Sequence, residues 1–202
     1  MLYIVRHGVT EYNAKRMFQG TLDIPLNEEG IAAAELVAHN LKDVDIDRIY
    51  TSDLKRARTT AEIIGAKKNL VPMIDPRLRE IHMGKWQGKV KFHIEQEPDY
   101  IQFREQPHLY APQHGESFHE LIERIESFQR EICPEENTVV VTHGLVILTW
   151  LNLLEGKELV ELYHRDFIEN CEVIAVDMKT NHIQRNVFHL DPVGVWAIEK
   201  DK

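Results

Sequence analysis

The chain has 202 residues, of which 43% are hydrophobic and 28% charged, a composition typical of one folded domain with a substantial apolar core. Its formal net charge of −9 argues against a nucleic-acid partner, because phosphate contacts need clustered lysine and arginine. A local cationic site for a small anion stays compatible with that charge. Met1 to Val5 is too short an apolar stretch for a secretory signal or a membrane span, so we expect a cytoplasmic protein with no membrane partner.

The cysteine and histidine content gives two further expectations. Two cysteines, Cys133 and Cys171, cannot make a disulfide framework and are expected to be buried thiols. The eleven histidines include no HExxH pattern, and no CxxC motif accompanies them, so we predict no protein-bound metal.

The first elements of the chain indicate a strand followed by a helix. Leu2 to Val5 is a continuous apolar run, typical of a central parallel strand. Asn27, with two glutamates after it, is a suitable helix N-cap. The apolar face predicted for this helix consists of Ile31, Ala34, Val37, Ala38 and Leu41.

A second strand and helix follow. Arg48 to Thr51 is predicted to be a short strand, and Ser52 or Asp53 can cap a helix that stops at Gly65. Residues 70–74 then indicate a strand, and the prolines in and after it favour an edge position.

Residues 81–116 differ in character, with three prolines and a dense mixture of charged and aromatic residues. We predict one helix, over about Phe92 to Phe103, and expect this segment to be a helical insertion that acts as a lid. A capping box at Ser117 then opens an amphipathic helix that ends before Pro134.

The last third of the chain predicts a strand at Thr138 to Thr142, an apolar helix through Leu154, and an antiparallel hairpin of residues 173–177 and 183–190. Alternating strands and helices indicate an α/β three-layer sandwich with a mostly parallel central sheet. No linker or repeat is visible, so residues 1–202 are expected to form a single domain.

Two of these strands end in the same way. Residues 2–5 are followed by Arg6-His7-Gly8, and residues 139–142 by His143-Gly144. Ligands of open α/β sheets bind at the carboxyl ends of the strands, and a glycine there lets a ligand approach the backbone closely. Arg56 falls in the first turn of the helix after the second strand. Together these residues predict a binding site for a dianion, because arginine binds phosphate oxygens bidentately and keeps its charge.

These motifs resemble the histidine phosphatase superfamily, in its phosphoglycerate-mutase-like branch. The resemblance covers about residues 2–175, with six motifs in the expected order. They are Arg6-His7-Gly8-Val9-Thr10 with Asn13; Asp23-Ile24-Pro25-Leu26 with Gly30; Ser52 to Ala57 with Thr60-Ala61; Leu78-Arg79-Glu80-Ile81 with Gly84, Trp86 and Gly88; Gly115-Glu116-Ser117; and Thr142-His143-Gly144.

The resemblance implies a role for each matching residue. His7 would be the nucleophile that becomes phosphorylated, while Arg6, Arg56 and His143 hold the phosphoryl group. Glu80 would be the general acid, although a surface ion pair with a neighbouring arginine is the alternative on composition. The remaining implied contacts to phosphate or substrate come from Asn13, Gln19, Gly20, Thr21 and Gly144, where the turn at 19–21 could equally be an ordinary glycine turn.

Three functions stay open on the sequence. The first is a cofactor-independent phosphomonoesterase that acts on small phosphorylated metabolites, either broadly or on substrates of the α-ribazole-phosphate type. The second is a bisphosphoglycerate-dependent mutase, and the third is an inactive phosphate-binding protein. The stretch Lys89 to His114 is short and mixed in charge, which favours the phosphatase, because mutases of this family have a longer and more basic insertion. The sequence leaves a homodimer open.

Overall fold

In the computed structural model, which describes residues 1–188, six strands pair into one sheet in the order β3-β2-β4-β1-β5-β6. The first four strands in that order run parallel, and β5 and β6 add an antiparallel edge. This is the mostly parallel sheet with a C-terminal antiparallel hairpin that the sequence predicts. The strands are β1 (Leu2–Arg6), β2 (Arg48–Thr51), β3 (Met73–Ile74), β4 (Thr138–Thr142), β5 (Val173–Asp177) and β6 (His182–Gln184).

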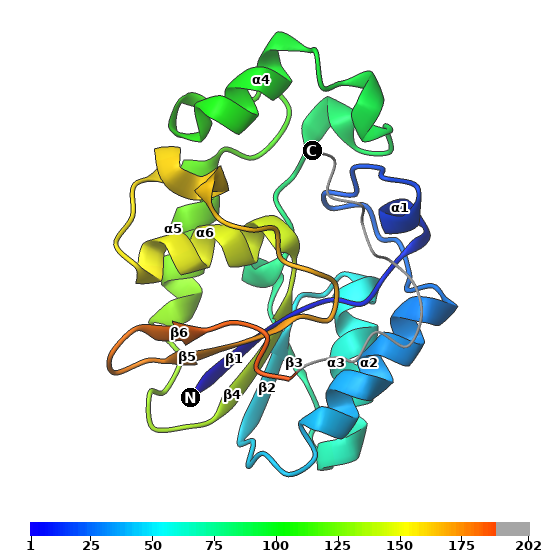
Figure 1. Cartoon of the computed structure of the whole chain (residues 1–202), viewed down its shortest axis with the longest axis vertical. Helices are drawn as coiled ribbons and strands as arrows, with labels where there is room; N and C mark the ends of the chain where they lie inside the picture. The colour runs from blue at the N-terminus through cyan, green and yellow to red at the C-terminus, as the bar shows by residue number, and fades with distance from the viewer. Residues whose placement is uncertain (189–202) are drawn as a thin grey trace.

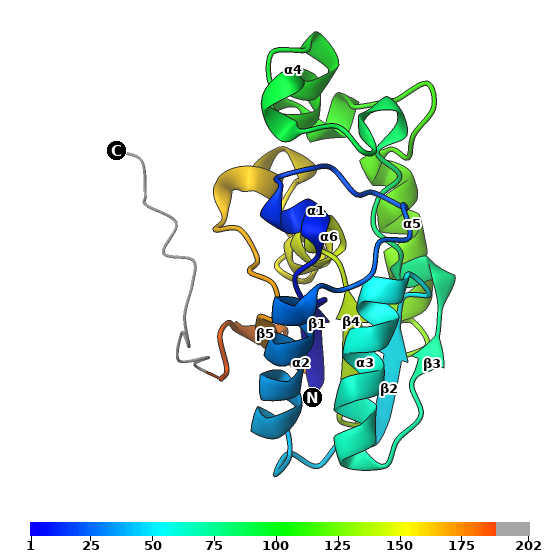
Figure 2. The same cartoon turned by 90° about the vertical axis from the view of Figure 1, so that its right-hand side faces the viewer.

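Helices cover both faces of the sheet, so the fold is the expected three-layer sandwich (Figure 1). On one face α2 (Glu28–Asn40) and α3 (Lys55–Lys68) lie side by side (Figure 2). On the other face lie α5 (Phe118–Gln129) and α6 (Gly144–Leu154). The side chains of β1 alternate between the two cores: Ile4 belongs to the cluster on the α5–α6 side and Val5 to the cluster on the α2–α3 side.

Three predicted details of α2 and α3 are wrong. Ile31 is not part of the buried face of α2, since 41% of it is exposed. The N-cap of α3 is Leu54 rather than Ser52 or Asp53, and the first amide of the helix, that of Lys55, donates instead to the carboxylate of Asp23. The helix continues past Gly65 to Lys68, and Asn69 takes the left-handed conformation that ends it. Gly65 is needed for another reason: a Cβ there would lie 2.4 Å from the carbonyl oxygen of Leu70, where the chain folds back against the helix.

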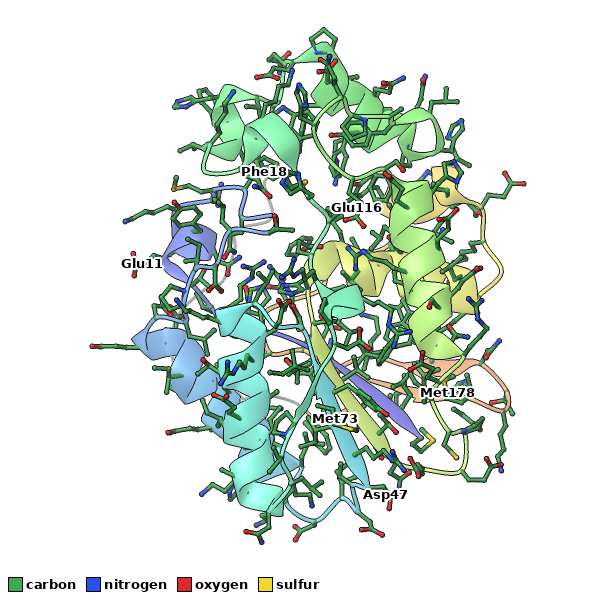
Figure 3. The ribbon with its side chains drawn as sticks, turned by 180° about the vertical axis from the view of Figure 1, so that it is seen from behind. Glu11, Phe18, Asp47, Met73, Glu116 and Met178 are labelled. Carbon is green, nitrogen blue, oxygen red and sulfur yellow. The ribbon has the colours of Figure 1, made fainter. Side chains whose placement is uncertain are left out.

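Residues 81–116 are less helical than expected. The predicted helix over 92–103 is a 3-10 turn, Lys91–His93, followed by α4 (Pro98–Glu105), because Pro98 fits the first turn of a helix. The segment lies beyond the carboxyl ends of the parallel strands (Figures 1 and 2). Phe18 packs on it through Trp86 and Tyr100, and Figure 3 places Phe18 at this end of the molecule, opposite Asp47 and Met178. Its action as a lid stays a prediction.

The remaining elements are short. They are α1 (Glu11–Ala14) and the 3-10 turns Pro76–Leu78, Gly84–Trp86, Pro107–Leu109 and Leu159–His164. Strand β6 ends at Gln184 rather than continuing toward Leu190, and residues 189–190 of that prediction lie outside the described residues. Cys171 is buried as expected, but Cys133 is exposed in the loop before β4, so the expectation for it is wrong. None of the helices described within residues 1–188 is long and apolar enough to cross a membrane.

Gly30 brings the start of α2 against the loop that follows β1. A Cβ on Gly30 would lie 2.1 Å from the carbonyl oxygen of Val9, a backbone atom that cannot move aside. Gly→Ala in a helix normally adds about 1 kcal/mol of stability. At Gly30→Ala we expect the opposite sign, a loss of about 1–3 kcal/mol in the free energy of unfolding, because overpacking displaces backbone.

Urea unfolding of Gly30→Ala, beside the reference variant Ala32→Gly, checks this prediction. Ala32 is exposed on the same helix, so Ala32→Gly should lower the free energy of unfolding only through the lower helix propensity of glycine, by about 1 kcal/mol. A gain in stability for Gly30→Ala would show that the loop at Val9 is not held against this helix.

Candidate active site

The two predicted histidines lie side by side because their strands are neighbours in register. β1 and β4 are parallel, with Arg6 opposite Thr142, so the next residue of each strand is a histidine at the same edge of the sheet. The rings of His7 and His143 have their centroids 5.1 Å apart, and both side chains are buried. The predicted convergence of the two strand ends is therefore found.

The hydrogen bonds of His7 define its tautomer. Nδ1 lies 2.7 Å from the carbonyl oxygen of Gly8, and a carbonyl can only accept, so Nδ1 carries the proton and Nε2 has a free lone pair. Burial, and then the nearby charges of Arg56 and Arg6, hold the pKa of His7 well below its usual value. His7 is therefore a neutral imidazole whose Nε2 can act as a nucleophile.

His143 is fully buried, yet among the described residues neither of its ring nitrogens has a hydrogen-bond partner. Burial, followed by the charge of Arg56, also lowers the pKa of His143 well below its usual value. Buried polar groups in native proteins are nearly always hydrogen bonded, so an imidazole in this state indicates a position for a ligand.

Two buried arginines supply positive charge beside the histidines. Arg6 donates from Nη1 to the carbonyl oxygen of Ile168 at 2.5 Å, and Arg56 donates to the carbonyl oxygens of Gly20 and Leu22, both at 2.7 Å. In both side chains Nε is buried without a partner among the described residues. Burial lowers the pKa of Arg56 to about 10, which leaves it charged at neutral pH. The pair can neutralise an anion held against the histidines.

Glu80 also lies at this site, on the stretch between the 3-10 turns Pro76–Leu78 and Gly84–Trp86. Its Oε1 accepts from the backbone N–H of Ile81 at 3.0 Å and its Oε2 from that of Leu145 at 3.3 Å. A Cβ built on Gly144 would lie 3.5 Å from Nε of Arg6 and 3.9 Å from Oε2 of Glu80, so Gly144 lies between them. Burial raises the pKa of Glu80, against the opposing effect of these hydrogen bonds and of Arg56.

The surface ion pair considered for Glu80 is absent from the described residues. Arg77 pairs with Asp75 and Glu131, and Arg79 pairs with Asp53. The two arginines next to Glu80 are thus occupied elsewhere, and its carboxylate stays beside Gly144.

Of the other predicted contacts, the structure brings Gly20 directly to Arg56, while Gln19, Thr21 and Asn13 bond to other residues. Gln19 is buried and accepts from the hydroxyl of Thr10, and Gly20 has a positive φ of 51° that lets its carbonyl meet Arg56. Thr21 donates its N–H and its hydroxyl to Oε1 of Gln87. Asn13 caps α1 through Oδ1, which accepts from Thr10, so a bond from Asn13 to phosphate would use its other amide atom, Nδ2.

Three residues that the sequence reasoning did not assign hold the nucleophile loop and the cationic groups. The hydroxyl of Thr60 accepts from the N–H of Gly8 at 3.1 Å, and Asn170 donates to the carbonyl oxygen of His7 at 2.8 Å. The exposed ring of Phe167 lies 4.7 Å from the guanidinium carbon of Arg6. Thr60 lies within a quoted motif and could have been found, whereas Asn170 and Phe167 belong to a loop with no sequence signal.

Together these groups could hold a phosphoryl group between two cations and present a nitrogen lone pair to it. Within residues 1–188, no group of three or more His, Cys, Asp or Glu side chains is placed to hold a metal ion. The positive charge of the site comes from Arg6 and Arg56, and Glu80 is a buried carboxyl that could exchange a proton with a bound ligand.

Comparison with known proteins agrees with this geometry. Residues 2–189 match the model of the histidine phosphatase superfamily (branch 1). Phosphoglycerate mutase-like protein 4 of Arabidopsis thaliana is 40% identical over 96% of this chain and 88% of its own length. The mycobacterial glucosyl-3-phosphoglycerate phosphatase has a TM-score of 0.79 at 28% identity, over 93% of this chain and 97% of that one. The α-ribazole phosphatase of Shigella flexneri has a TM-score of 0.79 at 25% identity, over 91% and 94%. The chain therefore belongs to the histidine phosphatase superfamily, branch 1.

Proposed function

We propose that this protein is a metal-independent phosphomonoesterase that hydrolyses small phosphorylated metabolites through a phosphohistidine on His7. One observation carries the proposal: the Nδ1–H of His7 is bound to its own loop, which leaves Nε2 free beside the unpartnered nitrogens of His143. The glucosyl-3-phosphoglycerate and α-ribazole phosphatases among its structural neighbours support hydrolysis of this substrate class.

The reaction would proceed in two displacements. In the first, Nε2 of His7 attacks phosphorus, the bond from phosphorus to the ester oxygen breaks, and Glu80 donates its proton to that oxygen as the alcohol leaves. In the second, the Glu80 carboxylate takes a proton from water, the water oxygen attacks phosphorus, and the N–P bond breaks. Inorganic phosphate leaves, and His7 and Glu80 return to their starting states.

Electrostatic stabilisation would supply much of the rate. Arg6 and Arg56 lie where the charge on the phosphoryl oxygens is held, in a water-poor site in which such interactions are stronger than in water. Their own hydrogen bonds to backbone carbonyls orient them before the substrate arrives. This pre-orientation is the second observation that supports phosphoryl transfer.

The choice of hydrolysis over a mutase is supported by the partners of Lys85, Lys91 and Arg104, three of the four lysines and arginines in residues 81–116. A mutase must bind a second phosphate, but Lys85 is paired with Glu97 and Asp99, and Lys91 with Glu95. The guanidinium of Arg104 lies 3.9 Å above the ring of Tyr163.

One observation favours the second candidate, a bisphosphoglycerate-dependent mutase: the Arabidopsis relative has a name that calls it mutase-like.

Hydrolysis of a chromogenic phosphomonoester in the presence of EDTA tests the proposal. We expect full turnover in EDTA, and no stimulation of phosphoglycerate isomerisation by bisphosphoglycerate. Loss of activity that a divalent cation restores would contradict the metal-free reaction. Isomerisation faster than hydrolysis would establish the mutase, and a panel of phosphorylated metabolites would then identify the preferred substrate.

The pH dependence of kcat/KM for an alkyl phosphate follows from the two pKa shifts. Protonation of His7 removes the nucleophile, and its pKa is well below 6.5, so the acid limb is expected well below pH 6.5. Loss of the proton from Glu80 removes the general acid, and its pKa is raised above 4.5, so activity is expected to fall as the pH rises through that raised value. The second ionisation of the substrate phosphate, at about pH 6, also changes kcat/KM, so its contribution is removed from the pH profile before the two limbs are assigned.

The variant Glu80→Gln identifies the alkaline limb. An amide does not titrate, so the fall in kcat/KM at high pH should disappear in this variant while the acid limb stays in place. An alkaline limb with an unchanged midpoint would assign that ionisation to another group.

A further inference from the structure

The position of Glu80 depends on a stretch of backbone that has no regular structure of its own. It lies between the 3-10 turns Pro76–Leu78 and Gly84–Trp86. The carboxylate contacts two backbone amides, of Ile81 and Leu145, and no side chain holds it directly within the described part of the chain. Whatever holds the backbone on either side of Glu80 therefore determines where its carboxylate lies.

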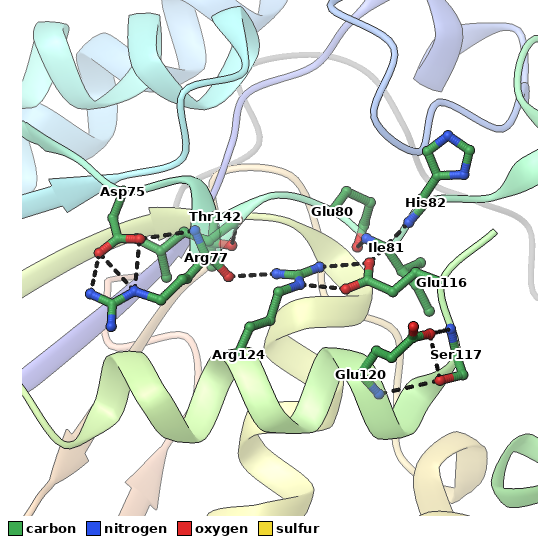
Figure 4. A network of polar contacts seen from close by, with 11 residues as sticks. Asp75, Arg77, Glu80, Ile81, His82, Glu116, Ser117, Glu120, Arg124 and Thr142 are labelled. Carbon is green, nitrogen blue, oxygen red and sulfur yellow. Dashed lines mark hydrogen bonds and ion pairs between the residues drawn. The ribbon is translucent and has the colours of Figure 1, made fainter.

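Arg124, on α5, contacts the backbone before Glu80 directly and the backbone after it through Glu116 (Figure 4). Its Nη1 donates to the carbonyl oxygen of Arg77, three residues before Glu80. Its Nε and Nη2 donate to the two carboxylate oxygens of Glu116, at 2.5 and 3.0 Å. The planar guanidinium thus uses three donors in one plane, which a lysine cannot reproduce.

Glu116 completes the attachment on the other side. Its Oε2 accepts from the N–H of His82 at 3.1 Å, and its own N–H donates to the carbonyl oxygen of His82 at 2.9 Å. The side chains of Arg124 and Glu116 are only 18% and 17% exposed, so solvent competes little for this bidentate pair. Glu116 belongs to the Gly115-Glu116-Ser117 motif, to which the proposed reaction gives no part.

We propose that the Arg124–Glu116 pair positions Glu80 for proton transfer to the leaving oxygen. The inference rests on the proposed function, in which Glu80 is the general acid. Loosening the pair would let residues 77–82 shift and move the carboxylate away from the leaving group, while His7 and the arginines stay in place. The loss in kcat/KM should therefore appear with a leaving group that needs a proton and be absent with a leaving group that does not.

Two substrates with different leaving groups separate these cases. The leaving oxygen of an alkyl phosphate needs a proton, whereas nitrophenolate leaves without one, and kcat/KM reports the first displacement for both. We expect Glu116→Gln and Arg124→Met to lower kcat/KM for the alkyl phosphate by about 10–100-fold, as misplacement by about 1 Å does in other enzymes. The value for nitrophenyl phosphate should change by less than about threefold, because no acid assists that leaving group.

Arg124→Lys separates positioning from charge. Arg124 also contributes to lowering the pKa of His143, and that charge acts on the phosphoryl group of both substrates alike. Lysine keeps the charge but not the three planar donors of the guanidinium. A positioning role therefore predicts that kcat/KM for the alkyl phosphate stays low relative to kcat/KM for nitrophenyl phosphate. Restoration of the wild-type ratio by lysine would overturn the proposal.

The matched control is Glu131→Gln. Glu131 also lies on the α5 side and pairs bidentately with Arg77 of the same stretch, at 2.7 and 2.9 Å, but this pair does not reach past Glu80. The ratio of the two kcat/KM values should stay at the wild-type value in this variant. Because the ratio is measured on one preparation, partial unfolding of any variant cancels from it.

The variant Glu80→Gln distinguishes failure of the proposed mechanism from failure of the positioning role alone. If Glu80→Gln affects both substrates equally, Glu80 is not the general acid and the proposed mechanism fails. If Glu80→Gln lowers kcat/KM for the alkyl phosphate selectively, but Glu116→Gln and Arg124→Met act equally on both substrates, the positioning role alone is overturned.

Discussion

The variant His7→Asn is expected to lose at least about 10⁴-fold in kcat/KM, the size of effect seen when an enzyme loses its nucleophile. Asparagine has no nitrogen that can attack phosphorus. The cationic groups around position 7 keep their own backbone partners, so phosphate should still bind. Steady-state hydrolysis of nitrophenyl phosphate and inhibition by inorganic phosphate measure the two effects separately.

A second readout follows the intermediate itself. Rapid acid-free quenching of the wild-type enzyme with labelled substrate should trap one phosphate on His7, and none on His7→Asn. The comparison variant is His39→Asn, at an exposed position in the last turn of α2, which should retain wild-type activity. Near-normal turnover of His7→Asn would contradict the assignment of the nucleophile.

The second large effect is expected from Arg56→Lys, with a loss of about 10²–10³-fold in kcat/KM, as when an oxyanion-binding donor is removed. Arg56 uses two nitrogens to hold the carbonyl oxygens of Gly20 and Leu22, and its Nε has no partner among the described residues, so it is free to bind an anion. A lysine ammonium is a point charge and cannot span these partners. The substitution therefore removes an anion contact and releases the turn at residues 19–21.

Arg58→Lys is the matched variant on the same helix. Arg58 forms an exposed ion pair with Glu62, one helical turn along, and such pairs contribute little to stability. Its activity should equal that of the wild type, whereas Arg56→Lys should be strongly impaired with an unchanged circular-dichroism spectrum. Equal activity of the two variants would mean that Arg56 serves only the fold.

The sequence predicts the sheet and the convergence of the site because both depend on local patterns. The apolar runs at 2–5 and 138–142 are typical of buried strands, and a histidine follows each of them at its carboxyl end. The sheet order, in which these two parallel strands are neighbours, then brings the histidines together. The motif order extends the same reasoning to Arg56 and Glu80, and the structure brings both to this edge.

Other features depend on contacts between distant residues and have no local signal. Gly65 looks like a helix stop, but it is required by the close passage of Leu70. Asn170 follows more than 160 residues after His7 in a loop of no clear pattern, so its bond to the nucleophile loop is invisible in the sequence. The attachment of the backbone on either side of Glu80 by Arg124 and Glu116 likewise depends on residues that are distant in the sequence.

The Gly8 carbonyl that accepts from His7 has a consequence for how this protein can diverge. A main-chain oxygen is present whatever side chains surround it, so no single side-chain exchange can delete the acceptor that sets the tautomer. Only a change that moves the Gly8 turn itself, held between Gly30 and Thr60, could do so. Descendants of this chain can therefore replace the residues that face the leaving group and acquire new substrates while the reactive nitrogen is inherited unchanged.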